Sequence, residues 1–285
     1  MASHNFQFVD CHFENIGQKF QQRLICLPLD RSRSNPNFHR AVFQDEDVRY
    51  GLADESAVTL ISDEPFAAWE PEGVVALPQA QLLAPVVPTK IVCAGINYRA
   101  HAAEMGHAIP DEPVIFLKPP TSVIGHGAEI RVPRGLGTVD HEAELAVVLG
   151  RRTHKVSPED AQGHILGYLC ANDVTSRALQ KKDGQWTRAK GFDTFCPLGP
   201  WVETDFDPSD AVIECYVNGQ LKQHSRTSDM IFDPLRLVSF VSHVMTLLPG
   251  DVVLTGTPSG VGPLVPGDVV EVRIDGIGSL INRVV

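Results

Sequence analysis

Short apolar runs separated by glycine- and proline-rich turns dominate the chain from residue 90 onward. Ile91–Ala94, Val114–Leu117 and Ile165–Ala171 each have the length and composition of a buried strand. Asp268–Ile274 alternates polar and apolar residues, as a strand with one buried face does. Many short strands, few helices and frequent turns predict a β-rich α+β domain built around a folded or barrel-like sheet.

Three segments carry helix signals. Asn97 can cap a short helix that Gly106 ends, and Ser157, which a proline follows, can cap a second. Asp233, also followed by a proline, starts the longest helix, in which apolar residues recur at helical spacing. We expect this last helix to pack on the core without a role in chemistry.

The pattern divides the chain into three parts. Residues 1–36 are read as an N-terminal extension or arm, which the pattern does not assign. Residues 37–88 form a small N-terminal β domain with its linker: short antiparallel strands between residues 41 and 61, then a stretch from 65 to 88 that prolines interrupt too often for long elements. Residues 89–285 form the main domain, which carries every candidate site residue.

Composition limits the partners. The 285 residues carry a net charge of −11, and Lys and Arg form no cluster. Nucleic acid and anionic membranes are therefore excluded as main partners, because phosphate groups need clustered positive charge. Six scattered cysteines without a C-x-x-C pair suggest buried free thiols. With no signal sequence and no apolar run of membrane-spanning length, we expect a cytoplasmic protein.

Two glutamates precede the most apolar run of the chain. In a strand, Glu142 and Glu144 share one face, and the cost of placing two carboxylates together calls for a cation. Asp173 ends the next apolar run and would bring a third carboxylate to the same edge. Oxygen ligands without Cys or His suit Mg²⁺, Mn²⁺ or Ca²⁺ better than zinc. The alternative is a strand end with two solvated glutamates.

Other polar residues are candidates for catalysis. His101 and Glu104 are three residues apart on the expected short helix, so the carboxylate can orient the imidazole as a general base, although a surface pair is the alternative. Gln180 lies two helical turns beyond Asp173, where it could orient a substrate carbonyl or remain a surface amide. Lys190 has small and aromatic neighbours, which favour a semi-buried amine as much as an exposed one before a glycine turn.

A glycine-rich segment, 256–262, follows a predicted strand and could direct backbone N–H groups at a carboxylate, although a hairpin turn is the default interpretation. It lacks the Lys-Ser/Thr ending of a P-loop and the G-x-G-x-x-G pattern. The chain also has no G-x-S-x-G and no H-E-x-x-H, so serine hydrolases and zinc proteases of those types lose support.

In this order, the segments resemble the fumarylacetoacetate hydrolase family over roughly residues 90–285, and most of all its shorter members. These members include acylpyruvate hydrolases, oxaloacetate decarboxylases and isomerase/decarboxylases of aromatic catabolism. The matching blocks are Gly95-Ile-Asn-Tyr with His-x-x-Glu, Phe116-Leu-Lys-Pro, His141-Glu-Ala-Glu-Leu, Asn172-Asp-Val-Thr-Ser-Arg with Gln180, Lys190-Gly-Phe-Asp-Thr-Phe and Thr255-Gly-Thr-Pro-Ser-Gly-Val-Gly.

The resemblance implies a mixed, barrel-like sheet of the fumarylacetoacetate hydrolase C-terminal type, preceded by a small N-terminal β domain. It implies Mg²⁺ or Mn²⁺ held by Glu142, Glu144 and Asp173, and a His101–Glu104 dyad on a lid. It places Lys190 and Gln180 near the reacting carbonyl, and Gly256, Thr257 and Arg177 at the substrate. Family members are commonly homodimers, so a homodimer is expected.

We therefore expect a divalent-metal-dependent hydrolase that cleaves a C–C bond of an acylpyruvate, such as fumarylpyruvate, through a metal-stabilised enolate. The substrate would be a small anionic 2-oxo acid. The alternative is a decarboxylase or isomerase of 2-oxo or 2-hydroxydienoic acids, which would use the same site. A non-catalytic metal-binding subunit is the third possibility, and the intact set of candidate residues argues against it.

Overall fold

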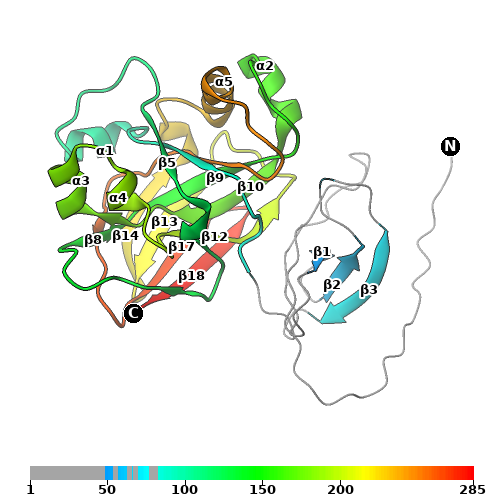
Figure 1. Cartoon of the computed structure of the whole chain (residues 1–285), viewed down its shortest axis with the longest axis horizontal. Coiled ribbons are helices and arrows are strands. Elements are labelled where there is room, and N and C mark those ends of the chain that lie inside the picture. Colours follow the sequence, from blue (N-terminus) through cyan, green and yellow to red (C-terminus); the bar gives the residue numbers. More distant parts are fainter. Residues whose placement is uncertain (1–48, 54–56, 63–65, 67–69, 77–82) are drawn as a thin grey trace.

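The computed structural model describes residues 49–53, 57–62, 66, 70–76 and 83–285. The fold is α+β and rich in strands, as the sequence predicts (Figure 1). A mixed seven-stranded sheet runs in the order β5-β4-β15-β9-β10-β12-β6. Its strands are β4 (Ile91–Ala94), β5 (Ile115–Lys118), β6 (Val123–Ile124), β9 (Ala143–Leu149), β10 (Ile165–Asn172), β12 (Cys196–Glu203) and β15 (Val252–Leu254).

Two further sheets complete the main domain. The five-stranded sheet has the order β14-β13-β17-β18-β7 and the three-stranded sheet the order β11-β8-β16. Their strands are β7 (Glu129–Ile130), β8 (Val139–His141), β11 (Thr175–Ser176), β13 (Val212–Val217), β14 (Gln220–Arg226), β16 (Gly262–Pro263), β17 (Val269–Ile274) and β18 (Gly278–Val284).

The helices lie in the connections between strands (Figure 1). They are α1 (Arg99–Glu104), α2 (Pro158–Ala161), α3 (Arg177–Asp183), α4 (Thr187–Lys190) and α5 (Pro234–Val244), with 3₁₀ turns at Pro120–Ser122, Gln162–His164 and Thr227–Asp229. Both predicted proline-associated caps form. The Ser157 hydroxyl accepts from the Asp160 N–H at 3.2 Å, and the Asp233 carboxylate accepts from the Arg236 N–H at 2.9 Å.

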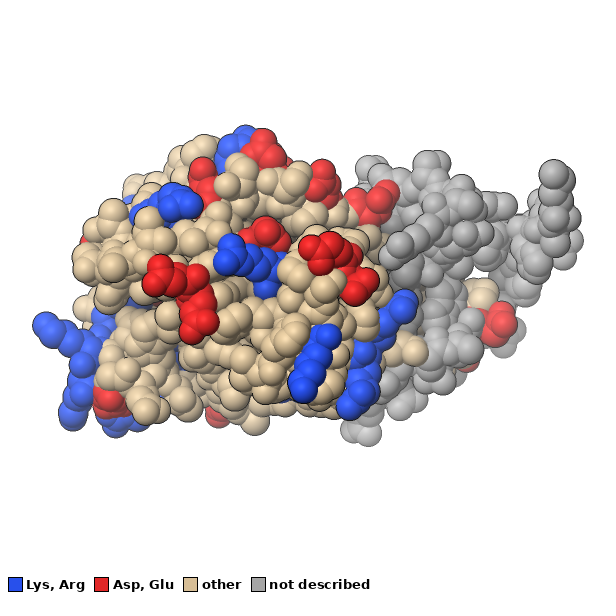
Figure 2. Space-filling model, turned by 90° about the horizontal axis from the view of Figure 1, so that it is seen from above, with Lys and Arg blue, Asp and Glu red and all other residues tan. Residues whose placement is uncertain are grey.

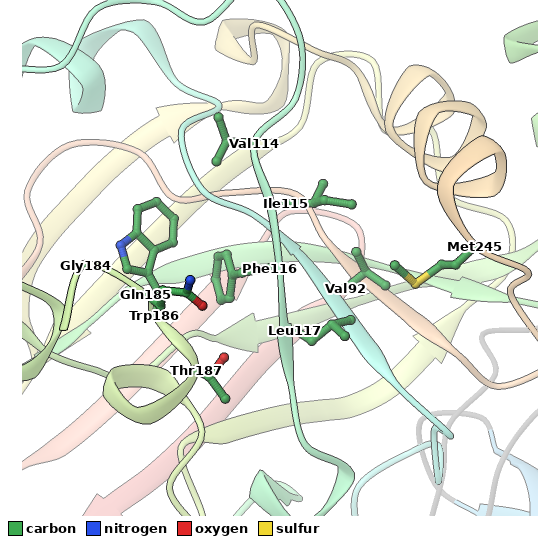
Figure 3. Close-up of a pocket in the computed structure, with 10 residues that line it drawn as sticks. All are labelled: Val92, Val114, Ile115, Phe116, Leu117, Gly184, Gln185, Trp186, Thr187 and Met245. Atoms are coloured by element: carbon green, nitrogen blue, oxygen red, sulfur yellow. The ribbon is translucent and has the colours of Figure 1, made fainter.

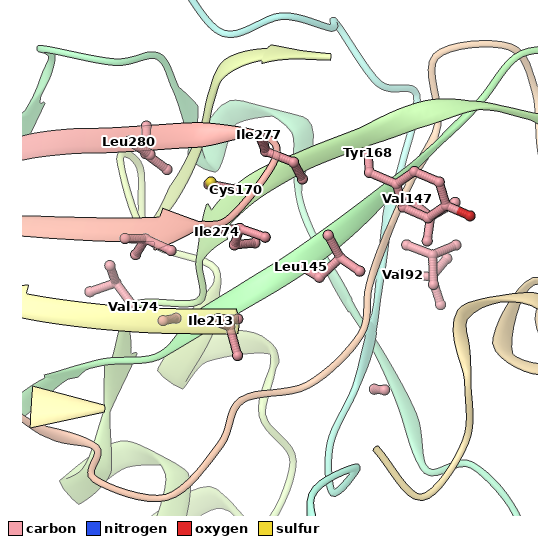
Figure 4. Close-up of a cluster of buried hydrophobic side chains, with 14 of the residues drawn as sticks. Val92, Leu145, Val147, Tyr168, Cys170, Val174, Ile213, Ile274, Ile277 and Leu280 are labelled. Atoms are coloured by element: carbon pink, nitrogen blue, oxygen red, sulfur yellow. The ribbon is translucent and has the colours of Figure 1, made fainter. Parts of the chain in front are cut away.

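Strand β9 is buried on both faces and separates two apolar clusters. Leu145 and Val147 point into the larger cluster, whose labelled members appear in Figure 4, whereas Ala146 and Val148 point into the smaller one. Burying a side chain of the size of Leu or Val contributes about 1.5–3 kcal/mol relative to leaving it exposed. The strand that leads out of the acidic segment is therefore held rigidly from both sides.

The expected cap at Asn97 is wrong. Tyr98 occupies the N-cap position of α1, and no side chain caps that helix. The Asn97 amide instead donates to the Phe232 and Thr255 carbonyls at 2.8 and 2.7 Å and accepts from the Phe232 N–H at 2.8 Å. Asn97 therefore ties the start of the α1 segment to the end of β15 and to the chain before α5.

The N-terminal strands form an antiparallel sheet in the order β1-β2-β3. Strands β1 (Tyr50–Ala53) and β2 (Ala57–Ile61) match the predicted pattern. Strand β3 (Pro71–Ala76) lies within the stretch that we expected to hold no long element and to serve as a linker. It has six residues, and Pro71 takes its first position, where a proline is tolerated. The expectations for residues 1–36 and for a strand at 41–43 lie outside the described residues.

The cysteines and the helices can be compared with the predictions of free thiols and of no membrane-spanning segment. Cys93, Cys170, Cys196 and Cys215 are free and buried in the structure, as predicted for these four. Within the described ranges, every helix is too short or too polar to cross a membrane. Acidic and basic side chains are interspersed over the described part of the face seen in Figure 2.

Candidate active site

Three buried carboxylates meet where β9 and β10 pair. The antiparallel register sets Ala171 opposite Glu144 and Asn172 opposite Ala143, and the Asp173 N–H donates to the Glu142 carbonyl at 2.9 Å. One carboxylate oxygen from each of Glu142, Glu144 and Asp173 lies within 4.8 Å of the others. Glu142 occupies a one-residue break between β8 and β9, so the acidic segment is not the continuous strand that we expected.

Basic side chains surround these acids, which we call the acid triad. The Lys190 ammonium donates to Glu142 Oε2 at 2.8 Å and to Asp173 Oδ2 at 2.6 Å. Arg177 Nη1 lies 2.7 Å from Glu142 Oε1. Lys118, at the end of β5, is buried and pairs with the other Asp173 oxygen. Lys190 is therefore buried at the acids, and the alternative of an exposed lysine is wrong.

Lys118 is a site residue that we did not predict. Its only local signal is a lone lysine at the end of an apolar run, within the Phe-Leu-Lys-Pro block. A buried lysine is rare unless it is paired, so this pattern could have drawn attention to it.

The pKa values of Glu142 and Glu144 are shifted in opposite directions. Burial raises the pKa of Glu142, but Lys190 and Arg177 outweigh burial and lower it to about 2. For Glu144, burial and the charges of Asp173 and Glu142 raise the pKa well above its usual value. Burial lowers the pKa of Lys190, but Asp173 and Glu142 outweigh this effect and raise it. The charged form of Glu144 is thus disfavoured at this site, whereas that of Glu142 is stabilised.

The donor set fits a divalent cation. Asp140 adds a fourth carboxylate beside the acid triad, whereas Lys118, Lys190 and Arg177 supply three positive charges. An uncompensated buried carboxylate is costly, and a cation near Glu144 would remove that cost. The oxygen ligands are of the kind that hard divalent ions prefer.

The proposed dyad forms on α1. His101 Nδ1 lies 3.0 Å from Glu104 Oε2, and the His101 side chain is buried. The other Glu104 oxygen accepts from the Gly260 N–H at 3.0 Å. Glu104 is thereby bound to the same segment whose Gly256 N–H donates to Glu144 of the acid triad. The structure brings the dyad to the site, whereas its function as a lid stays a prediction.

Arg177 joins Gln180 to the acids. Its Nε donates to Asp140 Oδ2 at 2.7 Å and its Nη1 to Gln180 Oε1 at 2.9 Å. Arg177 Nη2 and Asp140 Oδ1 are buried without a hydrogen-bond partner. The contact that the structure gives Gln180 is with Arg177, so a role for the amide at a substrate carbonyl stays a prediction.

The glycine-rich segment closes on the acid triad and is more than a hairpin turn. The Gly256 N–H donates to Glu144 Oε2 at 2.6 Å, and the Thr257 hydroxyl donates to the Ala143 carbonyl at 2.8 Å. Gly256 has a φ of +90°, and a Cβ there would lie 2.7 Å from the Asn97 Cβ. The segment therefore needs glycine at this position to approach the site closely.

An aromatic wall borders the lysine side of the site. The Phe116 ring centre lies 5.1 Å from Lys190 Nζ, and Trp186 packs against Phe116 edge to face, with ring centres 5.2 Å apart. Both rings lie on the same side of β5 in Figure 3, and they line a cavity of about 480 Å³ along that strand. Uncharged residues line this cavity throughout.

Fold and site together define a strand-rich α+β enzyme with buried carboxylates beside a histidine–glutamate pair. The family model for the fumarylacetoacetate (FAA) hydrolase C-terminal domain matches residues 90–285. A second model, Rv2993c-like N-terminal, matches residues 41–85. The chain belongs to the fumarylacetoacetate hydrolase family.

Individual relatives cover most of the chain. Protein Rv2993c of Mycobacterium tuberculosis is 49% identical over 253 residues, which are 85% of this chain and 93% of the relative. A protein named mitochondrial oxaloacetate tautomerase fahd2, from Xenopus laevis, is 46% identical over 72% of this chain and 68% of its own length. The structure titled 2-hydroxyhepta-2,4-diene-1,7-dioate isomerase, from Mycobacterium marinum, is 43% identical with a TM-score of 0.78, covering 94% of this chain and 98% of that one.

Proposed function

We propose that this chain is a Mg²⁺- or Mn²⁺-dependent enzyme that acts on small anionic 2-oxo acids. The observation that supports this most strongly is the acid triad, Glu142, Glu144 and Asp173, buried beside Lys190. A bound divalent cation would supply positive charge to the carboxylate and keto oxygens of such a substrate and to the negative charge that develops during reaction.

The surrounding groups suit an anionic ligand. Arg177 Nη2 is buried without a partner, and a substrate carboxylate would accept a hydrogen bond from it. Three basic side chains plus a divalent cation would also exceed the charge of the four carboxylates, leaving the site positive. The Gly256 N–H donates to Glu144 Oε2, and the N–H of the next residue, Thr257, is proposed to donate to a second carboxylate oxygen of the substrate.

His101 is the proposed base. Because Nδ1 faces Glu104, the carboxylate keeps the proton on Nδ1, and Nε2 is left to take a proton. In the hydrolysis of an acylpyruvate, His101 would remove a proton from the water that attacks the distal carbonyl. The C–C bond then breaks, and a carboxylic acid and pyruvate leave. Lys190 and Gln180 are proposed to stabilise the developing charge.

Isomerisation or tautomerisation of a 2-oxo acid is the second candidate, with decarboxylation as a related reaction. The names of the Xenopus laevis and Mycobacterium marinum relatives favour it. The same base would serve, because His101 can move a proton between a carbon and an oxygen of the substrate without an attacking water. The unpartnered Nη2 of Arg177 would then donate a hydrogen bond to the second carboxylate of a dicarboxylic acid such as oxaloacetate.

One panel separates these activities. Pyruvate release from acetylpyruvate, fumarylpyruvate and oxaloacetate, and the keto–enol conversion of oxaloacetate, are each measured with EDTA and with added Mg²⁺. EDTA-sensitive turnover of an acylpyruvate supports the hydrolase. Conversion of oxaloacetate without pyruvate release supports the tautomerase. Pyruvate release from oxaloacetate alone supports a decarboxylase, and no turnover at all would leave the non-catalytic metal-binding subunit.

The dyad is tested by substitution. His101→Ala should lower hydrolysis by roughly 10²–10⁴-fold, the usual contribution of a general base. Hydrolysis should fall more than decarboxylation, which needs no attacking water. His107→Ala, which changes an exposed histidine in the same segment, is the control. Equal losses in both reactions would refute water activation by His101. A homodimer remains a further proposal, which light scattering on the purified chain would test.

A further inference from the structure

Gln223 is a fully buried amide on a strand whose side chains are otherwise largely exposed. It lies in the middle of β14, where the remaining residues are exposed or half-buried. The sequence around it is polar throughout and does not distinguish it from its neighbours. A buried amide must find partners for its donors and acceptors, so its contacts indicate what it holds in place.

The Gln223 side chain connects the start of β9 to the glycine-rich segment. Its Oε1 accepts from the Ala143 N–H at 3.0 Å and lies 3.0 Å from His141 Nδ1. Its Nε2 donates to Thr257 Oγ1 and to the Pro258 carbonyl, both at 2.8 Å. A backbone N–H can only donate and a carbonyl can only accept, so these contacts fix the orientation of the amide.

Thr257 closes the connection. Its hydroxyl accepts from Gln223 and donates to the Ala143 carbonyl at 2.8 Å. The hydroxyl proton is therefore committed within the protein, and Thr257 can offer a ligand only its backbone N–H. Elsewhere in the segment, the Gly256 N–H already donates to Glu144 of the acid triad and the Gly260 N–H to Glu104, and Pro258 has no N–H. A shift of the segment would thus change both the direction and the position of its backbone N–H groups.

A second contact holds the same segment. A Cβ on Gly260 would lie 2.2 Å from the Lys222 carbonyl oxygen, so the segment packs directly on the backbone of β14 beside Gln223. We propose that Gln223 is a positioning residue, which fixes the segment from Gly256 to Gly260 so that the backbone N–H of Thr257 meets a carboxylate of the bound anion. The inference rests on the proposed function for the nature of that anion.

Oxalate binding to the Mn²⁺-loaded chain tests this without requiring turnover. Gln223→Glu keeps the size of the side chain and its acceptor, but sets an oxygen against the Pro258 carbonyl. We expect calorimetry to show a roughly tenfold weaker oxalate affinity and a Mn²⁺ affinity changed by less than about threefold. Gln220→Glu, the same change at an exposed position of β14, should alter neither.

A double-mutant cycle separates positioning from a general loss of structure. Thr257→Val removes the hydroxyl that Gln223 binds. If Gln223 acts through Thr257, the double variant should bind oxalate no more weakly than the worse single variant. Additive losses, or equal weakening of Mn²⁺ and oxalate by Gln223→Glu, would overturn this inference alone. Failure of the unmodified chain to bind Mn²⁺ would overturn the proposed function and this inference with it.

Discussion

Trp186 lies directly against Gly95, where an added Cβ would stand 2.3 Å from the indole Cζ3. Gly95 follows β4 and leads into the helix that carries His101, whereas Trp186 immediately precedes the helix that carries Lys190. The indole also packs on Phe116, whose ring lies near the Lys190 ammonium. A contact between residues far apart in sequence therefore aligns the two segments that supply the proposed base and the proposed charge-stabilising amine.

Gly95→Ala should damage this alignment. The methyl group would displace Trp186, at a cost in unfolding free energy of about 1–3 kcal/mol, as for other overpacked sites. Activity on whichever substrate the panel identifies should fall by at least about tenfold, because small displacements of reacting groups are costly. Urea unfolding and steady-state kinetics measure the two effects.

A matched glycine provides the control for Gly95→Ala. A Cβ on Gly163 would meet nothing within 4 Å, so Gly163→Ala should change stability by no more than about 0.5 kcal/mol. If both variants have the same free energy of unfolding, the close packing of Trp186 on Gly95 does not contribute to stability.

Glu142→Ala should remove metal-dependent turnover. The substitution takes away one oxygen donor, and Arg177 loses its ion pair with Glu142 while keeping the one with Asp140. We expect Mn²⁺ affinity, measured by calorimetry, to fall at least about 100-fold. Glu112→Ala, which changes an exposed acid, should bind Mn²⁺ normally. Full Mg²⁺-dependent activity in Glu142→Ala would refute the assignment of the metal site.

Local pattern was enough to find the acids. Glu142 and Glu144 were predicted to share one face from their alternate positions in the sequence. Asp173 was predicted to join them because it ends the next apolar run, and consecutive strands commonly pair. The His101–Glu104 spacing likewise predicted a contact within one helix. The division of the chain near residues 36 and 88 stays a prediction.

Residues positioned by distant pairing could not be found in this way. Lys118 reaches Asp173 only because β5 and β10 belong to one sheet, and Gln223 reaches the site from a different sheet. Asn97 is a similar case. Its position in the sequence favours a helix cap, but its side chain donates to the distant Phe232 and Thr255 carbonyls instead. These contacts link residues from 34 to 158 positions apart in the sequence, so local pattern alone does not predict which partners meet.

Lys118→Met should destabilise the chain. Removing one partner of a buried ion pair costs about 3–5 kcal/mol, and the contact that Lys190 keeps with Asp173 sets this case at the lower end. Urea unfolding in EDTA measures the loss without a contribution from metal. Lys222→Met, at an exposed site, should cost no more than about 0.5 kcal/mol. Equal stability of the two variants would mean that Lys118 is not needed to compensate Asp173.

His126 should make stability depend on pH. Its Nδ1 lies 3.1 Å from the Ser279 carbonyl and 3.3 Å from the Ile281 backbone nitrogen. Burial lowers the pKa of His126, and the Ser279 carbonyl and Glu271 offset only part of that effect. The folded chain therefore binds fewer protons at this imidazole than the unfolded chain does. Its contribution to stability is complete above the unfolded pKa of about 6.5 and is lost as the pH falls through the lower, folded pKa.

Comparison with His126→Gln isolates this contribution, because glutamine keeps a polar side chain that stays neutral at every pH tested. The free energy of unfolding in urea is measured for both proteins at about pH 7.5 and about pH 5.5. The advantage of the unmodified chain over the variant should shrink or reverse at the lower pH, since only the unmodified chain must keep a buried imidazole unprotonated. His107→Gln, at an exposed histidine, should show the same difference from the unmodified chain at both values. An unchanged advantage in His126→Gln would show that this imidazole titrates alike in the folded and unfolded chains.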